Sequence, residues 1–292
     1  MLELAVIAVR LLQYLGAMVL FGSSLFFVYA APGIWPKRLL AGAAAVLALS
    51  SLLAIGAQAS VFAGSLAAGL TGEALGAVVA SMDFAKAALV RALAAALALL
   101  LLLSPAAPFA RPSVIGLAIV ATASLAWMGH GAASENPLQL AADIVHALTA
   151  AIWLGALIAF GLMLAKQAEL AALHTALRRF SRIGAPLVAV LVLTGLVNSW
   201  FLVGPGQITA LGGTPYGRLL LVKLTLFAAM LVFALRNRTH HTPAIEAELA
   251  VSSANPKSVA RLRRSIAIEA ALGLGVLSAV AWFGTLPPPA SS

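Results

Sequence analysis

The sequence predicts an all-α polytopic membrane protein with about eight transmembrane helices in one bundle. Of its 292 residues, 62% are hydrophobic and only 9% are charged, whereas about 25% of the residues in a typical soluble protein are charged. The apolar residues fall into eight runs, each close to the roughly 20 residues that a helix needs to cross a bilayer. Composition and run length together therefore predict a single transmembrane domain over residues 1–292.

Each run is delimited by basic residues, prolines or a polar loop. The first run contains Arg10, and we expect it to be a retained helix rather than a cleaved signal peptide. Proline at the start of the fifth run suits the first turn of a helix. In chain order, the predicted spans are residues 4–29, 39–61 after Lys37 and Arg38, 84–103 before Pro105, 113–130 ending at His130, 137–164 beginning with Pro137, 183–203 after Arg182, 216–235 before Arg236, and 265–286 before three prolines.

The basic residues predict the orientation of the chain in the membrane. The net charge of +9 comes from residues that cluster between apolar runs, which indicates the positive-inside rule rather than a nucleic-acid partner. The side without this cluster has little beyond Lys86 and Arg218. We therefore expect a multi-pass membrane protein with both termini on the outer side, which is the periplasm or, in a cell with one membrane, the exterior. The residues assigned to the cytoplasmic side are Lys37, Arg38, Arg111, Lys166, Arg178, Arg179, Arg182, Arg236, Arg238, Lys257, Arg261, Arg263 and Arg264.

Two connections on the periplasmic side are longer than simple turns. Residues 62–82 are glycine-rich and half apolar, which favours an interfacial helix. Residues 204–217 carry several glycine and proline turn signals. Within the spans, small residues such as Gly22 and Gly273 are expected to permit close helix contacts, although a composition rich in alanine and glycine explains them equally well.

Two histidines and an aspartate interrupt otherwise apolar sequence. His130 ends the fourth run, and Asp143 and His146 lie in the fifth. Ionisable groups are costly in a bilayer and mark functional positions. The two runs are joined by a short loop, so the helices are antiparallel neighbours and both imidazoles can face one cavity near the periplasmic side. The chain has no cysteine, so a copper or other soft-metal site must use histidine and methionine.

The fifth run places Asp143, His146 and Trp153 on one helix face, because their spacings are three and seven residues. Asp143 can orient the imidazole through a hydrogen bond or bind the metal itself. Met128 reaches His130 only if the helix end unwinds, since residues two apart point in different directions. The alternative for these residues is hydrogen-bonded packing.

Several other polar groups fall within the spans. Asn198 is expected to line the same cavity, and Glu269 is expected to pair with Arg264, five residues earlier, or else to lie on an inward path. The cations Lys86, Arg91 and Lys223 are expected to extend to the membrane surface (snorkelling). No phosphate-binding loop, H-E-x-x-H motif or Ser/His/Asp order is present, so we predict no enzyme.

An ordered set of motifs resembles the copper-resistance D (CopD) family of bacterial inner-membrane proteins. The match is densest over residues 129–289, and the first helix also fits through its motifs at 10–16 and 21–22. The motifs are RLLQYLG at 10–16, FG at 21–22, FSRIG at 180–184, LTGLVN at 193–198, TPYGRLLLVK at 214–223, LRRSIAIE at 262–269 and GTLPPP at 284–289.

The resemblance implies that the protein handles copper, as Cu⁺ or Cu²⁺, taking it up or transferring it from the periplasm. The family's histidines fall on His130 and His146. A separate periplasmic copper chaperone is implied as the donor, and membrane lipid surrounds the chain. Two alternatives remain open at this point. One is a membrane b-type haem protein that uses the same two histidines as axial ligands, and the other is a copper sensor or assembly factor without transport.

Overall fold

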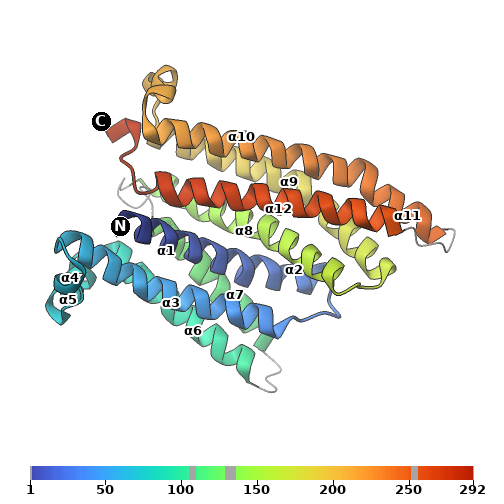
Figure 1. The fold of residues 1–292 in the computed structure, drawn as a ribbon, viewed down its shortest axis with the longest axis horizontal. Helices are drawn as coiled ribbons and strands as arrows, with labels where there is room; N and C mark the ends of the chain where they lie inside the picture. The colour runs from blue at the N-terminus through green and yellow to red at the C-terminus, as the bar shows by residue number, and fades with distance from the viewer. Residues whose placement is uncertain (1, 105–109, 129–135, 251–255, 292) are drawn as a thin grey trace.

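The computed structural model describes residues 2–104, 110–128, 136–250 and 256–291, and this part of the chain consists of helices joined by turns and short loops, with no strand (Figure 1). It contains eight helical segments that are long and apolar enough to cross a membrane. This confirms the predicted fold class. The helical elements are α1 Leu2–Ala17, η1 Met18–Ser23, α2 Ser24–Tyr29, α3 Lys37–Phe62, α4 Leu66–Gly69, α5 Gly72–Ser81, α6 Asp83–Leu103, α7 Ala110–Ala123, η2 Ser124–Met128, α8 Pro137–Ala165, α9 Leu170–Leu202, η4 Pro205–Gly213, α10 Pro215–Arg236, η5 Asn237–His241, α11 Thr242–Ala250, α12 Pro256–Phe283 and η6 Pro289–Ser291.

The last spans begin or end well outside the predicted limits. Helix α9 begins 13 residues before position 183 and continues through Pro186. Helical structure also continues from α10 through η5 and α11 to Ala250. The prediction stopped at basic residues, which limit what enters the bilayer. Arginine and lysine are nevertheless good helix formers, so the helices extend into water at this end of the bundle. The fourth span is described only to Met128, so its predicted end at His130 lies outside the described residues.

Helix starts follow the local chemistry of the sequence. Pro137 occupies the first turn of α8, and the Asn136 side chain accepts a hydrogen bond from the amide of Leu138 at 2.9 Å. Thr214 caps α10 in the same way, since its hydroxyl accepts from the amide of Gly217 at 3.0 Å. These caps satisfy amides that have no partner within the helix. The long connection at 62–82 forms α4 and α5, as the sequence favoured.

The chain folds as two groups of four spans that share one long axis (Figure 1). In the N-terminal group, α1 packs on α3, α3 on α6, and α6 on α7. In the C-terminal group, α8 packs on α9 and α12, and α10 packs on α12. The groups meet where η1 crosses α8 and where α1 contacts α12. The start of α1 and the end of α12 lie at the same end of the bundle, as an even number of spans requires. We call this the terminal end.

Gly22 and Gly155 make the crossing between the two groups possible. A Cβ atom on Gly22 would lie 1.7 Å from the carbonyl oxygen of Ala151, and one on Gly155 would lie 2.4 Å from the backbone of Gly22. The hydroxyl of Ser23 also donates to the carbonyl of Gly155 at 2.8 Å. Gly22 and Ser23 lie in η1, a π-helical turn that interrupts the first span. The predicted role of Gly22 in a close helix contact is therefore confirmed.

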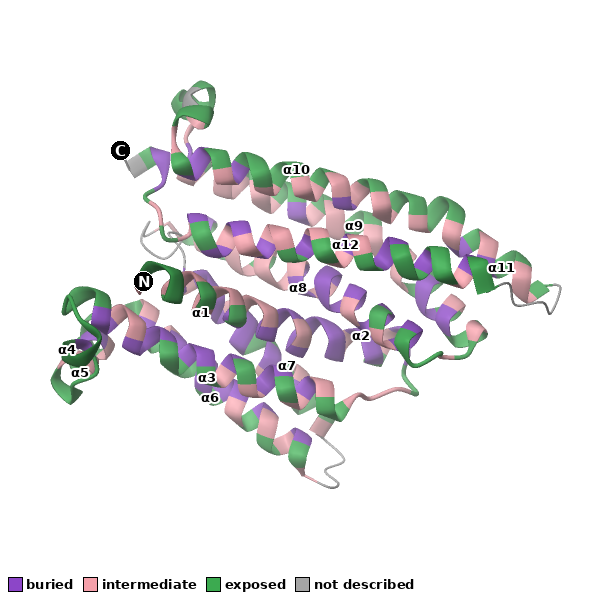
Figure 2. Cartoon of the chain, viewed as in Figure 1, coloured by how far each residue is buried: buried purple, intermediate pink, exposed green. Residues whose placement is uncertain are grey.

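Burial is concentrated where these two groups meet (Figure 2). The fifth span, α8, has 61% of its most apolar window buried, whereas the spans that contain α9 and α10 each have 11% buried. Exposed apolar residues such as Leu193, Leu196 and Val232 cover the outside of α9 and α10. A bilayer is the solvent that such a surface requires. Helix α8, which carries Asp143 and His146, is thus the central helix of the bundle.

Candidate metal-binding cavity

A cavity of about 350 Å³ and a smaller one of about 190 Å³ open near the terminal end of the bundle. The smaller one lies between α1, α8, α9, α10 and α12, and we call it the Asp143–His146 cavity. It collects polar side chains from four helices, α1, α8, α9 and α10, and α12 adds only apolar residues to its wall. Its ionisable and amide residues are Arg10, Tyr14, Asp143, His146, Asn198, Tyr216 and Lys223.

His146 is held in one orientation by a hydroxyl on the neighbouring helix. Its Nδ1 lies 2.8 Å from Oγ1 of Thr194 on α9. The single hydroxyl proton of Thr194 is already directed to the carbonyl oxygen of Val190, 2.7 Å away. A carbonyl can only accept, so Thr194 accepts from His146 and Nδ1 carries the proton. This leaves Nε2 of the imidazole with a free lone pair, the state that a metal requires.

Asp143 lies one turn before His146 on the same face of α8. The amide of Asn198 lies against its carboxyl group, and Lys223 is within electrostatic reach. Asp143 forms no ion pair shorter than 4.0 Å in the described part of the chain. The Oδ1 atom of Asn198 is buried and has no hydrogen-bond partner there. The predicted grouping of Asp143, His146 and Asn198 therefore appears in the structure, with imidazole, carboxylate and amide oxygen as potential ligands.

Two cations share the cavity wall with this single carboxylate. Lys223 places its ammonium 5.7 Å from the centre of the Phe283 ring, a distance at which a cation and an aromatic face attract each other. Arg10 reaches the same cavity from α1. Lys223 thus lines the cavity, and sequence reasoning missed it as a site residue. The available signal was its position one helical turn after Leu220 and two turns after Tyr216, which places all three residues on one face of α10.

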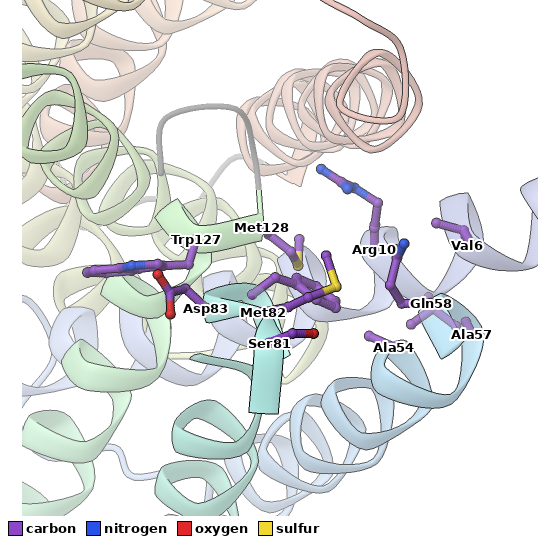
Figure 3. A pocket seen from close by; sticks show the side chains of 12 residues that line it. Val6, Arg10, Ala54, Ala57, Gln58, Ser81, Met82, Asp83, Trp127 and Met128 are labelled. Atoms are coloured by element: carbon purple, nitrogen blue, oxygen red, sulfur yellow. The ribbon is translucent and has the colours of Figure 1, made fainter. Parts of the chain in front are cut away.

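Met128 lies in a different cavity from His146. It lines the larger cavity together with Met82, Trp127 and Arg10 (Figure 3). Its sulfur accepts a hydrogen bond from Nη1 of Arg91 at 3.1 Å. Arg91 is fully buried, so the prediction that it would snorkel is wrong: neutral acceptors in the protein interior satisfy its guanidinium instead.

His130 lies outside the described residues, so its position relative to His146 is not described. Among the described residues, no group of three or more histidine, aspartate or glutamate side chains is close enough to hold a metal ion. The described residues of this cavity therefore contribute one imidazole, from His146, and one carboxylate, from Asp143. Any further strong ligand must come from elsewhere in the chain or from a partner.

Trp153 and Glu269 belong to a third cavity, of about 460 Å³, towards the opposite end of α8. The indole nitrogen of Trp153 donates to Oε1 of Glu269 at 2.8 Å, and the amide of Asn237 donates to Oε2 at 2.9 Å. Glu269 is only 2% exposed. The expected ion pair with Arg264 is absent from the described contacts, because α12 directs Glu269 into the bundle, whereas Arg264 is exposed.

The two cavities of the C-terminal group follow one another along the same four helices. The Asp143–His146 cavity uses the terminal ends of α8, α9, α10 and α12, and the Glu269 cavity uses the opposite ends. Trp153 packs against Phe227 between them, with ring centres 6.0 Å apart. Gly273 also lies between them, where the side chain of Leu154 occupies the space of the missing Cβ. The structure therefore separates the two cavities by a thin layer of packed side chains.

Comparison with known proteins identifies the family. Residues 1–140 match the family model described as copper resistance protein D-like, N-terminal domain, and residues 174–283 match the model of copper resistance protein D. Copper resistance protein D of Pseudomonas syringae pv. tomato is 36% identical over 97% of this chain and 96% of its own length. Copper transport protein CutJ of Bacillus subtilis is 31% identical over 56% of this chain and 28% of its own length. No solved structure matches. The chain belongs to the copper resistance protein D family.

Proposed function

We propose that this protein binds copper in the Asp143–His146 cavity and takes it up or transfers it from the periplasm. The observation that carries the proposal is the free Nε2 of His146, which the hydrogen bond from Nδ1 to Thr194 maintains. Neutral imidazole is a good ligand for copper. The membership of a family of copper resistance proteins supports copper as the cargo.

The remaining ligands follow from what surrounds His146. Asp143 and Oδ1 of Asn198 supply oxygen atoms within the same cavity. We propose His130 as the second imidazole, because it ends the neighbouring span in the sequence. Met128 is the proposed soft ligand for Cu⁺, but because it lines the other terminal cavity, it joins this site only if the end of its span rearranges and its hydrogen bond with Arg91 is given up. Thioether sulfur favours the softer oxidation state.

We further propose that the terminal end faces the periplasm and that a periplasmic copper chaperone delivers the metal there. The basic residues listed above support this orientation, because they gather at the opposite end of the spans. A fusion at Gly206 should activate a reporter that works only in the periplasm, and a fusion at His174 should activate a reporter that works only in the cytoplasm. The reverse pattern would refute the orientation and place the cavity on the cytoplasmic side.

Copper binding is tested by competition with a chelator, using purified protein in detergent with Cu⁺ and Cu²⁺ separately. His146→Ala should weaken binding at least tenfold. The matched control is His174→Ala, since His174 lies at the opposite end of α9 and pairs with Glu246 at 3.6 Å. Wild-type affinity in the His146 variant would show that the metal binds elsewhere. Copper uptake into proteoliposomes then separates a carrier from a sensor, and the absence of a Soret band in the optical spectrum separates both from a haem protein.

A further inference from the structure

Arg10 and Gln13 present buried hydrogen-bond donors that have no acceptor among the described residues. They lie three residues apart on α1 and therefore on one helix face. Nε and Nη2 of Arg10 and Nε2 of Gln13 are all buried, and none has a partner in the described part of the chain. Gln13 is 0% exposed. Three unsatisfied nitrogen sites within one helical turn are a costly arrangement, because each buried donor without an acceptor costs about 1–3 kcal/mol.

Arg91 explains why Gln13 cannot satisfy its neighbour. A guanidinium only donates, so the hydrogen bond from Nη1 of Arg91 fixes Oε1 of Gln13 towards Arg91. The amide nitrogen of Gln13 must then point away. The other acceptors of Arg91 are the hydroxyl and carbonyl of Ser124, each at 3.1 Å, and the sulfur of Met128. All of them are neutral, and no carboxylate in the described part of the chain lies within 4.0 Å of this fully buried group to balance its charge.

Arg10 lines both terminal cavities. It forms part of the wall of the larger one, of about 350 Å³ (Figure 3), and its Nη2 lies beside Gly284, which lines the Asp143–His146 cavity. Val6, Val9 and Ala54 form part of an apolar wall, and Gln58 adds a side-chain amide. Among the described lining residues, Asp83 alone carries a carboxylate, and it is paired with the exposed Lys86 at 2.9 Å. The cavity thus combines an excess of donors and positive charge with an apolar surface.

The end of α12 offers Arg10 only partial compensation. Nη2 of Arg10 occupies the space beside Gly284, where a Cβ atom would lie 2.4 Å away. The carboxyl end of a helix carries about half a negative charge, which favours a cation. Nevertheless, neither Nε nor Nη2 of Arg10 is hydrogen-bonded to a carbonyl in the residues that the structure describes. A ligand with several acceptor oxygens is what this arrangement lacks.

We propose that the cavity at Arg10 binds a phosphate-type oxyanion, either the phosphate of a lipid headgroup or free phosphate. Such a group accepts several hydrogen bonds at once and matches the fork of a guanidinium. Arg10 lies at the level where α12 ends, which is where headgroups meet a membrane helix. The bound anion would also offset the charge of Arg10 on the Asp143–His146 cavity, which the same side chain lines.

Two variants remove the site in different ways. Arg10→Gln deletes the charge. Gly284→Ala keeps it but fills the space of the guanidinium, which is the movable end of a long side chain and can shift without unfolding the protein. Lys86→Gln is the matched control, because it removes a cation from the same end of the bundle that is exposed and already paired with Asp83.

The full chain is purified in detergent and tested in two arms. In the first, thermal unfolding is followed during titration with sodium phosphate against sodium chloride at equal ionic strength. In the second, native mass spectrometry counts bound phosphatidylglycerol against phosphatidylcholine. A phosphate-dependent rise in Tm identifies free phosphate, and selective retention of phosphatidylglycerol identifies a headgroup. In either case the apparent Kd should rise at least tenfold in Arg10→Gln and Gly284→Ala and stay unchanged in Lys86→Gln.

The proposal is overturned if wild-type protein shows neither response, or if all three variants behave like it. Equal weakening in Lys86→Gln would also overturn it, because that result indicates a diffuse surface charge. Circular dichroism of each variant establishes that the helices are intact. Chelator competition at His146 is measured on the same samples, so loss of the anion is distinguishable from loss of the copper site.

Discussion

Thr194→Val tests the proposed state of His146 without touching the imidazole. Valine replaces the hydroxyl with a methyl group of similar size, so the packing of α8 on α9 is kept. The substitution removes the acceptor that lies 2.8 Å from Nδ1 of His146. The proton on Nδ1 is then left without its partner, so the tautomer protonated at Nδ1 loses its advantage over the one protonated at Nε2. That tautomer has no lone pair for a metal at Nε2.

The size of the effect follows from what the hydrogen bond does. Loss of a group that orients a metal-bound histidine lowers metal affinity about 10–100-fold, which corresponds to about 1.4–2.7 kcal/mol. Stability should fall as well, by about 1–3 kcal/mol if the buried Nδ1 proton remains unpaired. The assay is chelator competition with Cu⁺ in detergent, together with the midpoint of thermal unfolding.

A matched control makes the result interpretable. Thr225 on α10 also donates to the carbonyl four residues earlier, at 2.9 Å, but it is exposed and has no histidine beside it. Thr225→Val should therefore leave copper affinity unchanged. The reasoning is refuted if Thr194→Val binds copper as tightly as wild type while His146→Ala does not. In that case Nδ1, rather than Nε2, would hold the metal.

Two further predictions concern packing and the Glu269 cavity. Gly155→Ala should prevent folding, because its Cβ would lie 2.4 Å from backbone atoms of Gly22. Gly161→Ala in the same helix is the control and should not lower stability, since its Cβ would have nothing within 4 Å. Gel filtration in detergent distinguishes the outcomes, and a monodisperse Gly155→Ala protein would contradict the close crossing of η1 and α8. Glu269→Gln should lower stability by only about 1–2 kcal/mol, since a neutral acceptor replaces a charged one and Asn237 can rotate its unpartnered Oδ1 towards the new amide. A loss above about 4 kcal/mol in thermal or chemical unfolding would indicate a buried counter-charge left behind.

Three residues of the candidate cavity, Asp143, His146 and Asn198, could be grouped from the sequence. The apolar runs predicted the spans, and the three-residue spacing of Asp143 and His146 predicted that they share a face. Asn198 was placed correctly because depth along a span can be counted from its ends at about 1.5 Å per residue. Met128 was harder, because its direction depends on the 3₁₀ geometry of the last turn of its helix. The ion pair expected for Glu269 was wrong because sequence distance says little about which way a helix faces.

The sequence by itself determined the membrane class and the number of spans, because both depend on how long a run stays apolar. It also determined the family, through motifs at fixed positions. Only the tertiary structure decided which polar groups meet. Trp153 reaches Glu269 across 116 residues of sequence, and Arg91 reaches Gln13 across 78. Such pairs form because helix packing brings distant turns to the same depth, and a buried donor then takes whichever acceptor is present there.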